Sequence, residues 1–372
     1  MVWVSVAFGV LSFSVCESPR VYGLAWSAPW VMGAVLLGLE ISRRAEHDLM
    51  VVSSILIIIF YFSCRALELF FYFEAAGLPL LLRIIIVGRQ PQKVEAAKYM
   101  LFYIAFAALP LLFVISKSGA TVSSLFSGLG SVVILPFLAK MPAYMLHAWL
   151  PKAHVEASTP GSMVLAGRVI KLGTYGVLSW NLHSNRRVLG CAVVGLGVVL
   201  VGSALIRGVD RKTLVAYSSV LHIAVGLVAW ARCSARGWYG VLYSNVAHTI
   251  LRPMIFLGVS IFYGIQGGRD RSTIRGWMRW SFASIALVFV FLVNGGMPPA
   301  LLSGCEVLIC IGRGMGVLGL VVIRTGIFVS GLWTLRISAD QGRRLAKPAA
   351  WFRPGPIILS CLLSITTLPL LV

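Results

Sequence analysis

The sequence predicts an all-α polytopic membrane protein, and three observations lead to this fold class. The chain of 372 residues is 59% hydrophobic, which is well above the roughly 45–50% apolar content of a soluble domain. Long apolar runs recur along it, and with their mild flanks they approach the about 20 residues that cross a bilayer. Backbone groups in lipid must be hydrogen-bonded within their own segment, which favours helices for such continuous runs.

Charged clusters and glycine or proline residues divide the chain into about thirteen predicted transmembrane helices. In chain order they are 1–15, 21–39, 48–63, 65–87, 98–116, 127–150, 160–180, 188–206, 213–230, 239–264, 277–310, 315–337 and 354–372. The connections are short, so we expect one membrane domain over 1–372 and no soluble domain. The first apolar run has no basic residue ahead of it, which is atypical of a signal peptide, and we expect it to be retained as a helix.

Two of the predicted spans are interrupted by proline, which lacks an N–H and breaks a helix. One break is at Lys140-Met141-Pro142 and the other at 294–299 (NGGMPP). With one group of five helices in 48–185 and a second in 186–338, the broken span is the fourth of each group. Matched breaks of this kind indicate an inverted repeat with a central site. The remaining parts, 1–47 and 339–372, are then flanking helices.

The strong positive charge indicates a membrane surface rather than nucleic acid. The formal charge is +20, from 32 Lys and Arg against 12 Asp and Glu, and the basic residues lie mostly between apolar runs, as in ISRRAEHD and SNRRV. Cations at these places anchor helices at the headgroups and set their orientation. They also suit anionic lipids such as cardiolipin.

The cysteine and histidine patterns argue against a metal or a redox centre in this chain. Seven cysteines are scattered without a C-x-x-C motif, which disfavours iron–sulfur ligation, structural zinc and a disulfide framework. No histidine pair has the i, i+3 or i, i+4 spacing of helical metal ligands. We therefore expect no metal and no cofactor here, and we expect any electron transfer to take place in partner subunits.

Among the acids and lysines, Glu74, Lys140, Lys171 and Glu306 fall well inside predicted spans. An ionisable group at the bilayer centre costs about 2.5–3.5 kcal/mol on insertion scales, and such groups usually face the bundle interior and mark ion or proton routes. The alternative is that they lie near the interface and extend to the headgroups. Glu74 and Lys140 carry opposite charges on different helices, so we expect them to pair.

Three histidines, His147, His222 and His248, fall in or near predicted spans. Histidine titrates near neutrality and can pass a proton in either direction, so each is either a relay or a hydrogen-bonded packing residue. His154 follows Pro151, and we expect it in an interfacial loop.

These residues lie in runs that resemble a known family. KMPAYMLHAWLPKAHVEASTPGSMVLAGRVIKLGTYG closely resembles the chain 4 family of proton-pumping NADH:ubiquinone oxidoreductase (respiratory complex I), whose membrane subunits are antiporter-like. So do ELFFYFEA with GRQPQKVEAAKYMLFY, IRGVDRKTLVAYSSVLHI, and MPPALLSGCE. The resemblance implies about fourteen helices, two inverted five-helix repeats and a row of buried charges at mid-membrane.

The resemblance assigns a role in proton translocation to each of the four charged residues. Glu74 matches the carboxylate of F-E-A, and Lys140 matches the lysine before M-P. Lys171 matches the lysine of K-L-G-x-Y-G, which links the two half-channels of the family. Glu306 matches the carboxylate that follows the P-P break.

The family also implies what surrounds the chain. His222 and His248 match histidines on the polar axis, and His147 stays a candidate relay. The chain itself would bind no flavin, iron–sulfur cluster or NADH; these and the quinone are expected in partner subunits. Expected partners are the other membrane-arm subunits, especially neighbouring antiporter-like ones.

The implied activity is that of a proton-translocating subunit of NADH:ubiquinone reductase. The compact size and short loops resemble a protein of the mitochondrial inner membrane, with the bacterial plasma membrane as the alternative. Two other functions are compatible with the sequence. One is a subunit of a multi-subunit sodium/proton antiporter, and the other is a structural complex I subunit whose channel has decayed.

The sequence departs from the family pattern at several positions. Arg168 stands where the family has an aliphatic residue, three positions before Lys171 and so on the same helix face. A second cation there would disfavour the charged form of Lys171 unless Arg168 is paired or turned to an interface. Arg252 followed by Pro253 is also atypical, and we expect a kink there.

Two further features lie near the start of the matched region. Arg65 and Glu68 are one helical turn apart and are expected to neutralise each other. The region before Glu74 has room for three helices where the family usually has four, so we expect one helix to be missing or supplied by a partner.

Overall fold

The structure is a computed structural model that describes ten stretches of the chain. They are residues 44–63, 65–88, 90–118, 133–179, 187–208, 210–231, 235–266, 282–296, 300–311 and 317–341. The predicted helices 1–15, 21–39 and 354–372 lie outside the described residues. The chain divides into two compact units, Met1–Arg187 and Val188–Val372.

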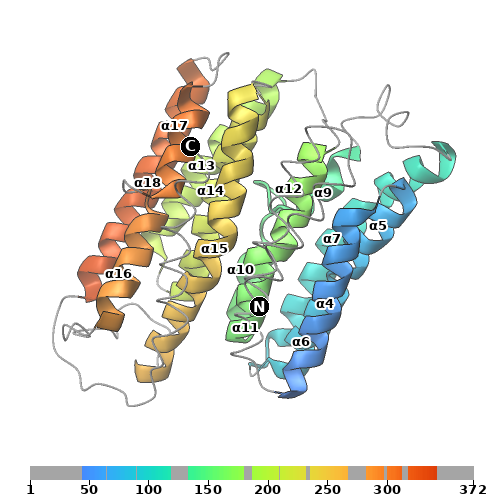
Figure 1. Cartoon of the computed structure of the whole chain (residues 1–372), viewed down its shortest axis with the longest axis horizontal. Coiled ribbons are helices and arrows are strands. Elements are labelled where there is room, and N and C mark those ends of the chain that lie inside the picture. The colour runs from blue at the N-terminus through green and yellow to red at the C-terminus, as the bar shows by residue number, and fades with distance from the viewer. Residues whose placement is uncertain are drawn as a thin grey trace. The chain divides into compact units, whose positions relative to one another are not determined.

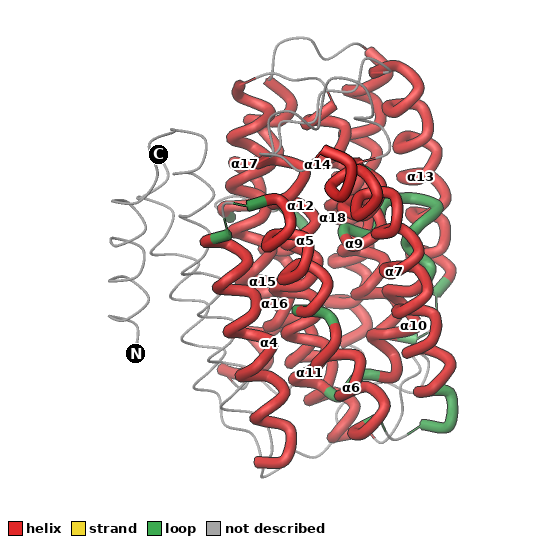
Figure 2. The backbone as a smooth tube through the Cα atoms, turned by 90° about the vertical axis from the view of Figure 1, so that its right-hand side faces the viewer, coloured by secondary structure: helices red, strands yellow, loops and turns green. Residues whose placement is uncertain are grey.

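All regular secondary structure in the described stretches is helical, as Figure 2 shows, and an all-α fold is therefore confirmed for them. In unit 1 the helices, blue to green in Figure 1, are α4 (Arg44–Phe62), α5 (Ala66–Ala75), α6 (Leu78–Val87), α7 (Lys93–Ser118), α9 (Leu135–Lys140), α10 (Trp149–Glu156), α11 (Thr159–Val164), the π-helical segment η2 (Leu165–Val169) and α12 (Ile170–Ser179). Helix α9 packs against α7 and α12, and α4 packs against α5 and α6.

Unit 2 has the same all-helical character. Its helices are α13 (Arg187–Arg207), α14 (Arg211–Ala231), α15 (Ala235–Gln266), α16 (Phe282–Asn294), α17 (Leu301–Ile311) and α18 (Val317–Gln341). Helix α15 packs against α14 and α17, and α18 packs against α14 and α16. Asp210 begins α14 by accepting the N–H of Lys212 at 3.0 Å, as expected for an N-cap residue.

The span predicted over 65–87 is not one continuous helix. Pro79 has no N–H to give to the preceding turn, and Gly77 donates instead to the carbonyl of Glu74 at 3.1 Å. The chain therefore leaves α5 at Ala75 and enters α6 at Leu78. The predicted span is confirmed as the 22-residue apolar stretch Ala66–Val87. The turn inside it does not follow from hydropathy, because a hydropathy pattern reports apolar length and not backbone hydrogen bonding.

Helix lengths and exposed faces fit a membrane. Within the described residues, Ala66–Val87, Lys93–Ser116 and Arg211–Trp230 are long and apolar enough to span a bilayer. Along α7 one face buries Met100, Ile104 and Leu111, while Phe102 and Phe106 on the other face are exposed. A helix that is apolar on its exposed face as well as its buried one suits lipid rather than water.

Candidate functional site

In unit 1 a buried lysine meets a carboxylate from another helix. The Lys140 Nζ lies 3.7 Å from Glu74 Oε1, and the lysine side chain is 0% exposed while that of Glu74 is 25% exposed. The ammonium also donates to the backbone carbonyl of Phe73 and lies 3.7 Å from the centroid of the Phe73 ring. The expected pairing of Glu74 with Lys140 is thus present, with backbone and aromatic contacts added to it.

The turn between α5 and α6 explains how the Phe73 carbonyl comes to accept the lysine. Gly77 donates to Glu74 O and not to Phe73 O, so the helix ends with the Phe73 carbonyl turned to another donor. A helix end leaves such carbonyls to be satisfied from outside. The G-x-P sequence that interrupts the span therefore builds part of the lysine site.

The helix that carries Lys140 ends at this residue, as the K-M-P sequence predicts. Because Pro142 has no N–H, the Leu138 carbonyl accepts Ala143 N at 2.9 Å instead. The Ala139 carbonyl accepts the indole Nε1–H of Trp149, also at 2.9 Å. Both carbonyls therefore have a hydrogen-bond donor, and the break leaves Lys140 as the last residue of α9.

Two glycines of the KLGTYG sequence let α12 approach α9 closely. A Cβ on Gly173 would lie 2.6 Å from the Phe137 carbonyl oxygen and 2.9 Å from Met141 N, and one on Gly176 would overlap the Phe137 ring. Lys171 lies two residues before Gly173 on α12 and is 5% exposed. The glycines therefore hold the helix of Lys171 against the helix of Lys140.

Alanine at Gly173 is expected to force α12 and α9 apart, since the new Cβ would meet backbone atoms that cannot rotate away. Overpacking of this kind typically costs about 1–3 kcal/mol, and we expect less assembled protein and slower proton translocation. Gly304→Ala is the matched control, because a Cβ at Gly304 would meet nothing within 4 Å. Equal assembly of the two variants on native gels would contradict this packing.

Arg168 is buried in unit 1 and lies in the π-helical segment that precedes α12. Its Nη1 donates to Ser54 Oγ on α4 at 2.6 Å, and the Ser54 hydroxyl donates in turn to the Met50 carbonyl at 2.5 Å. The guanidinium is thus directed to α4 and bonded to a hydroxyl, and no carboxylate of the described stretches lies in ion-pair range of it. π-Helical turns occur often at functional sites, and the sequence contains no signal for this one.

The two histidines of this region lie in different settings. His147 is half-buried in the turn between α9 and α10, and its ring stacks on Tyr144 with 5.6 Å between centroids. His154 was expected in an interfacial loop, and this is wrong: it lies in α10 and is 0% exposed. The helix continues past Pro151 because proline is tolerated in the first turn.

The exposed pair Arg65 and Glu68 is confirmed, with 3.6 Å between Nη1 and Oε1. Both side chains are largely exposed, so the pair contributes little to stability. It nevertheless offsets the two charges near the start of α5.

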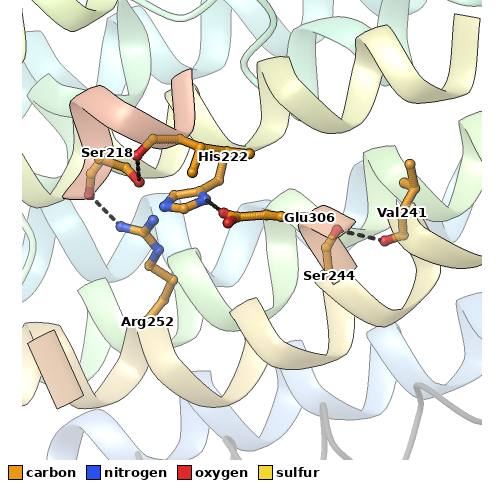
Figure 3. A network of polar contacts seen from close by, with 8 residues as sticks. Ser218, His222, Val241, Ser244, Arg252 and Glu306 are labelled. Carbon is orange, nitrogen blue, oxygen red and sulfur yellow. Dashed lines mark hydrogen bonds and ion pairs between the residues drawn. The ribbon is translucent and has the colours of Figure 1, made fainter. Parts of the chain in front are cut away.

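In unit 2 a carboxylate meets a histidine in the same manner. The His222 Nδ1 on α14 lies 4.0 Å from Glu306 Oε1 on α17, and each side chain is 9% exposed. The ring of His248, on α15, lies 6.1 Å from that of His222, at 65° to it. Figure 3 shows Glu306 pointing to the imidazole of His222 from a neighbouring helix.

The second break makes room for the Glu306 carboxylate. Helix α16 ends at Asn294, α17 begins at Leu301, and residues 297–299 lie outside the described chain. Gly296 has φ +76°, and a Cβ there would lie 2.6 Å from Glu306 Oε2. Only glycine adopts this backbone at no steric cost. Glycine at position 296 therefore allows the turn and also leaves space for the Glu306 carboxylate.

Arg252 lies beside this pair and is 0% exposed. Its Nη1 donates to Ser218 Oγ at 2.5 Å and to the Val215 carbonyl at 3.2 Å, both on α14. Helix α15 continues through Pro253 as one element, although Pro253 leaves the Thr249 carbonyl without its helical donor.

The structure therefore groups the predicted residues within each unit. Glu74 and Lys140 form an ion pair in unit 1, with Lys171 buried on the helix next to that of Lys140; His222, His248 and Glu306 gather in unit 2. In the described part of the chain no three His, Cys, Asp or Glu residues are placed to hold a metal ion. Both groups are suited to binding and releasing protons.

Comparisons with known proteins point to one family. The family model described as NADH:quinone oxidoreductase/Mrp antiporter, TM, matches residues 63–330. NADH-ubiquinone oxidoreductase chain 4 of Mytilus edulis is 36% identical over 294 residues, which are 73% of this chain and 67% of the relative. The chain 4 protein of Ascaris suum is 35% identical over 254 residues, which are 63% of this chain and 59% of the relative.

The match thus spans about three fifths to two thirds of the length of these two relatives. Among solved structures, a chain of respiratory complex I from Thermus thermophilus superposes with a TM-score of 0.80 at 18% identity, covering 99% of this chain and 90% of that one. At this identity the likeness shows the fold. The chain belongs to the NADH:quinone oxidoreductase/Mrp antiporter transmembrane family, as a chain 4-like, antiporter-like subunit.

Proposed function

We propose that this chain is a proton-translocating subunit of respiratory complex I and that the Glu74–Lys140 pair is its switching point. The observation that carries the proposal is the fully buried Lys140 ammonium, 3.7 Å from a Glu74 carboxylate that is itself partly exposed. For a buried amine, desolvation disfavours the charged form and a nearby carboxylate favours it. Moving the carboxylate toward or away from the amine then loads or releases a proton.

The magnitudes fit this role. Moving one proton against a potential on the order of 150–200 mV costs about 3.5–4.6 kcal/mol, which is about a thousandfold change in proton affinity. Two unit charges at about 4 Å interact by about 4 kcal/mol at an effective dielectric constant of 20. Making and breaking one such ion pair is therefore enough to drive one proton.

The other predicted residues extend the path. Glu306 and His222 exchange a proton in unit 2. His248, whose ring centroid lies 6.1 Å from that of His222, would deliver a proton to it through a bridging water. Lys171 is proposed as the relay between the two half-channels on the strength of its KLGTYG motif. His147, half-buried in the helix break next to Lys140, is a candidate proton entry.

The surroundings follow from the family. We propose about thirteen transmembrane helices, ten of them in two inverted five-helix repeats (48–185 and 186–338) and the others in the flanking regions. The matched helix breaks support this arrangement. The electron-transfer centres would lie in partner subunits, and neighbouring antiporter-like subunits of the membrane arm would pack against this chain. Anionic lipids such as cardiolipin would bind the basic loops of this multi-pass inner-membrane protein.

A sodium/proton antiporter subunit is the second candidate, because the matching family model includes Mrp antiporters. Such a subunit would exchange ions without NADH or quinone. Purified protein in vesicles distinguishes the two: sodium-driven proton movement in the absence of both substrates would favour the antiporter.

The Lys171→Ala variant distinguishes a proton-translocating subunit from a structural subunit whose channel has decayed. We expect slower proton pumping by the assembled complex, since the relay between half-channels would lack its ionisable group. Lys152→Ala is the control, because Lys152 is 44% exposed and ion-paired with Glu95. Unchanged pumping in the Lys171 variant would indicate a structural subunit.

A further inference from the structure

Arg252 occupies a defined place beside the His222–Glu306 pair, although no role for it follows from the family pattern. We propose that Arg252 is a positioning residue, a fixed positive charge that keeps His222 from retaining a proton and so passes that proton to Glu306. This proposal rests on the proton-translocating function above and adds a control element to its second half-channel.

The sequence spacing places the participating side chains on two facing helices. Ser218 and His222 are four residues apart on α14, and His248 and Arg252 are four apart on α15. Residues four apart share a helix face, and α14 packs against α15. The hydroxyl that holds the guanidinium and the imidazole beside it therefore belong to one face.

The hydrogen bonds of Arg252 orient its charge. Only Nη1 bonds to α14, through Ser218 and the Val215 carbonyl, while Nε and Nη2 have no hydrogen-bond partner among the described residues. Figure 3 shows the guanidinium directed at the imidazole of His222, with Glu306 on another side of that ring. No carboxylate of the described chain lies in ion-pair range of Arg252, so its charge is not neutralised locally.

The charge of Arg252 is what makes it favour proton transfer from His222 to Glu306. Arginine stays protonated in proteins, and a like charge disfavours the protonated imidazole. In the transfer step the imidazolium Nδ1–H bond of His222 breaks and an O–H bond forms at Glu306 Oε1, so that an imidazolium and a carboxylate become a neutral imidazole and a carboxylic acid. Without Arg252 the charged His222–Glu306 ion pair would persist and hold the proton.

Two substitutions at Arg252 distinguish the effect of its charge on pumping from the effect of its hydrogen bond to Ser218. Glutamine keeps an N–H donor for Ser218 but has no charge, whereas lysine keeps both a donor and the charge. In the assembled complex we expect Arg252→Gln to slow proton pumping about tenfold, the scale on which one neighbouring charge changes a protonation equilibrium. Arg252→Lys is expected to restore most of the rate, and equal rates in the two variants would overturn the proposal.

A double-mutant cycle shows whether Arg252 acts through His222. If it does, Arg252→Gln has little further effect on pumping in a His222→Gln background, whereas a purely structural arginine gives additive losses. A difference infrared spectrum of the complex provides a second readout. The protonated-carboxyl band that disappears in Glu306→Gln should weaken in Arg252→Gln and persist in Arg168→Gln, which removes an equally buried, serine-bonded arginine from unit 1.

The result also distinguishes this proposal from the function on which it rests. Normal pumping and an unchanged carboxyl band in Arg252→Gln, combined with failed pumping in a Lys140 variant, would reject the role of Arg252 alone. Normal pumping in the Lys140 variant would reject the proposed function.

Discussion

Lys140→Met is expected to stop NADH-driven proton pumping by the assembled complex while NADH oxidation in the partner subunits continues with an artificial electron acceptor. Lys140 is fully buried, and its ammonium contacts Glu74 Oε1 and the Phe73 carbonyl. Methionine fills a similar volume with no ionisable group, so the α9–α12 packing remains and the proton site is lost. Proton uptake and NADH oxidation measured on the same membranes separate the two effects.

Lys140→Arg is the matched control for charge. The guanidinium keeps the ion pair with Glu74 but does not release its proton, so we expect an assembled complex that does not pump. Pumping by the arginine variant at the normal rate would show that the positive charge matters and the titration does not.

Glu74→Gln is expected to reduce both assembly and pumping, because it leaves the buried Lys140 ammonium without its carboxylate. Breaking a buried ion pair from one side costs about 3–5 kcal/mol, and the partial exposure of Glu74 places the expected loss near the lower end. The lysine escapes this cost only by giving up its proton, after which the site no longer loads. Native-gel yield and pumping rate measure the two losses.

The double variant Glu74→Gln/Lys140→Met removes both charges together. Replacing a buried pair by neutral side chains of similar size is often neutral for stability, so we expect assembly to recover from the Glu74→Gln level while pumping does not. A yield no better than that of Glu74→Gln would contradict the direct coupling between the two residues.

Sequence alone predicted the all-helical fold and the Glu74–Lys140 pair, each for a physical reason. The helices follow from the length of the apolar runs. The pairing follows because two opposite charges in lipid are each costly alone. The end of α9 at Lys140 follows from Pro142, whose missing N–H acts on the backbone and is visible in the sequence.

Other features depend on contacts that no local pattern contains. Gly77 and Pro79 signal the turn between Ala75 and Leu78, but the mostly apolar run on both sides of it favours one continuous helix. The bond from Trp149 to the Ala139 carbonyl and the π-helical turn at Arg168 depend on how the backbone closes around the break. The position of Arg252 beside His222 depends on the packing of α14 on α15, for which the matching four-residue spacings were the available signal.

The claim that a buried lysine–carboxylate pair drives translocation is tested most directly by the number of protons moved per electron. The measurement uses the assembled complex carrying Glu74→Gln/Lys140→Met in proteoliposomes, with NADH as electron donor and a quinone as acceptor. We predict that this ratio falls close to zero when the rate of quinone reduction is matched to that of the unaltered complex. An unchanged ratio would contradict the account.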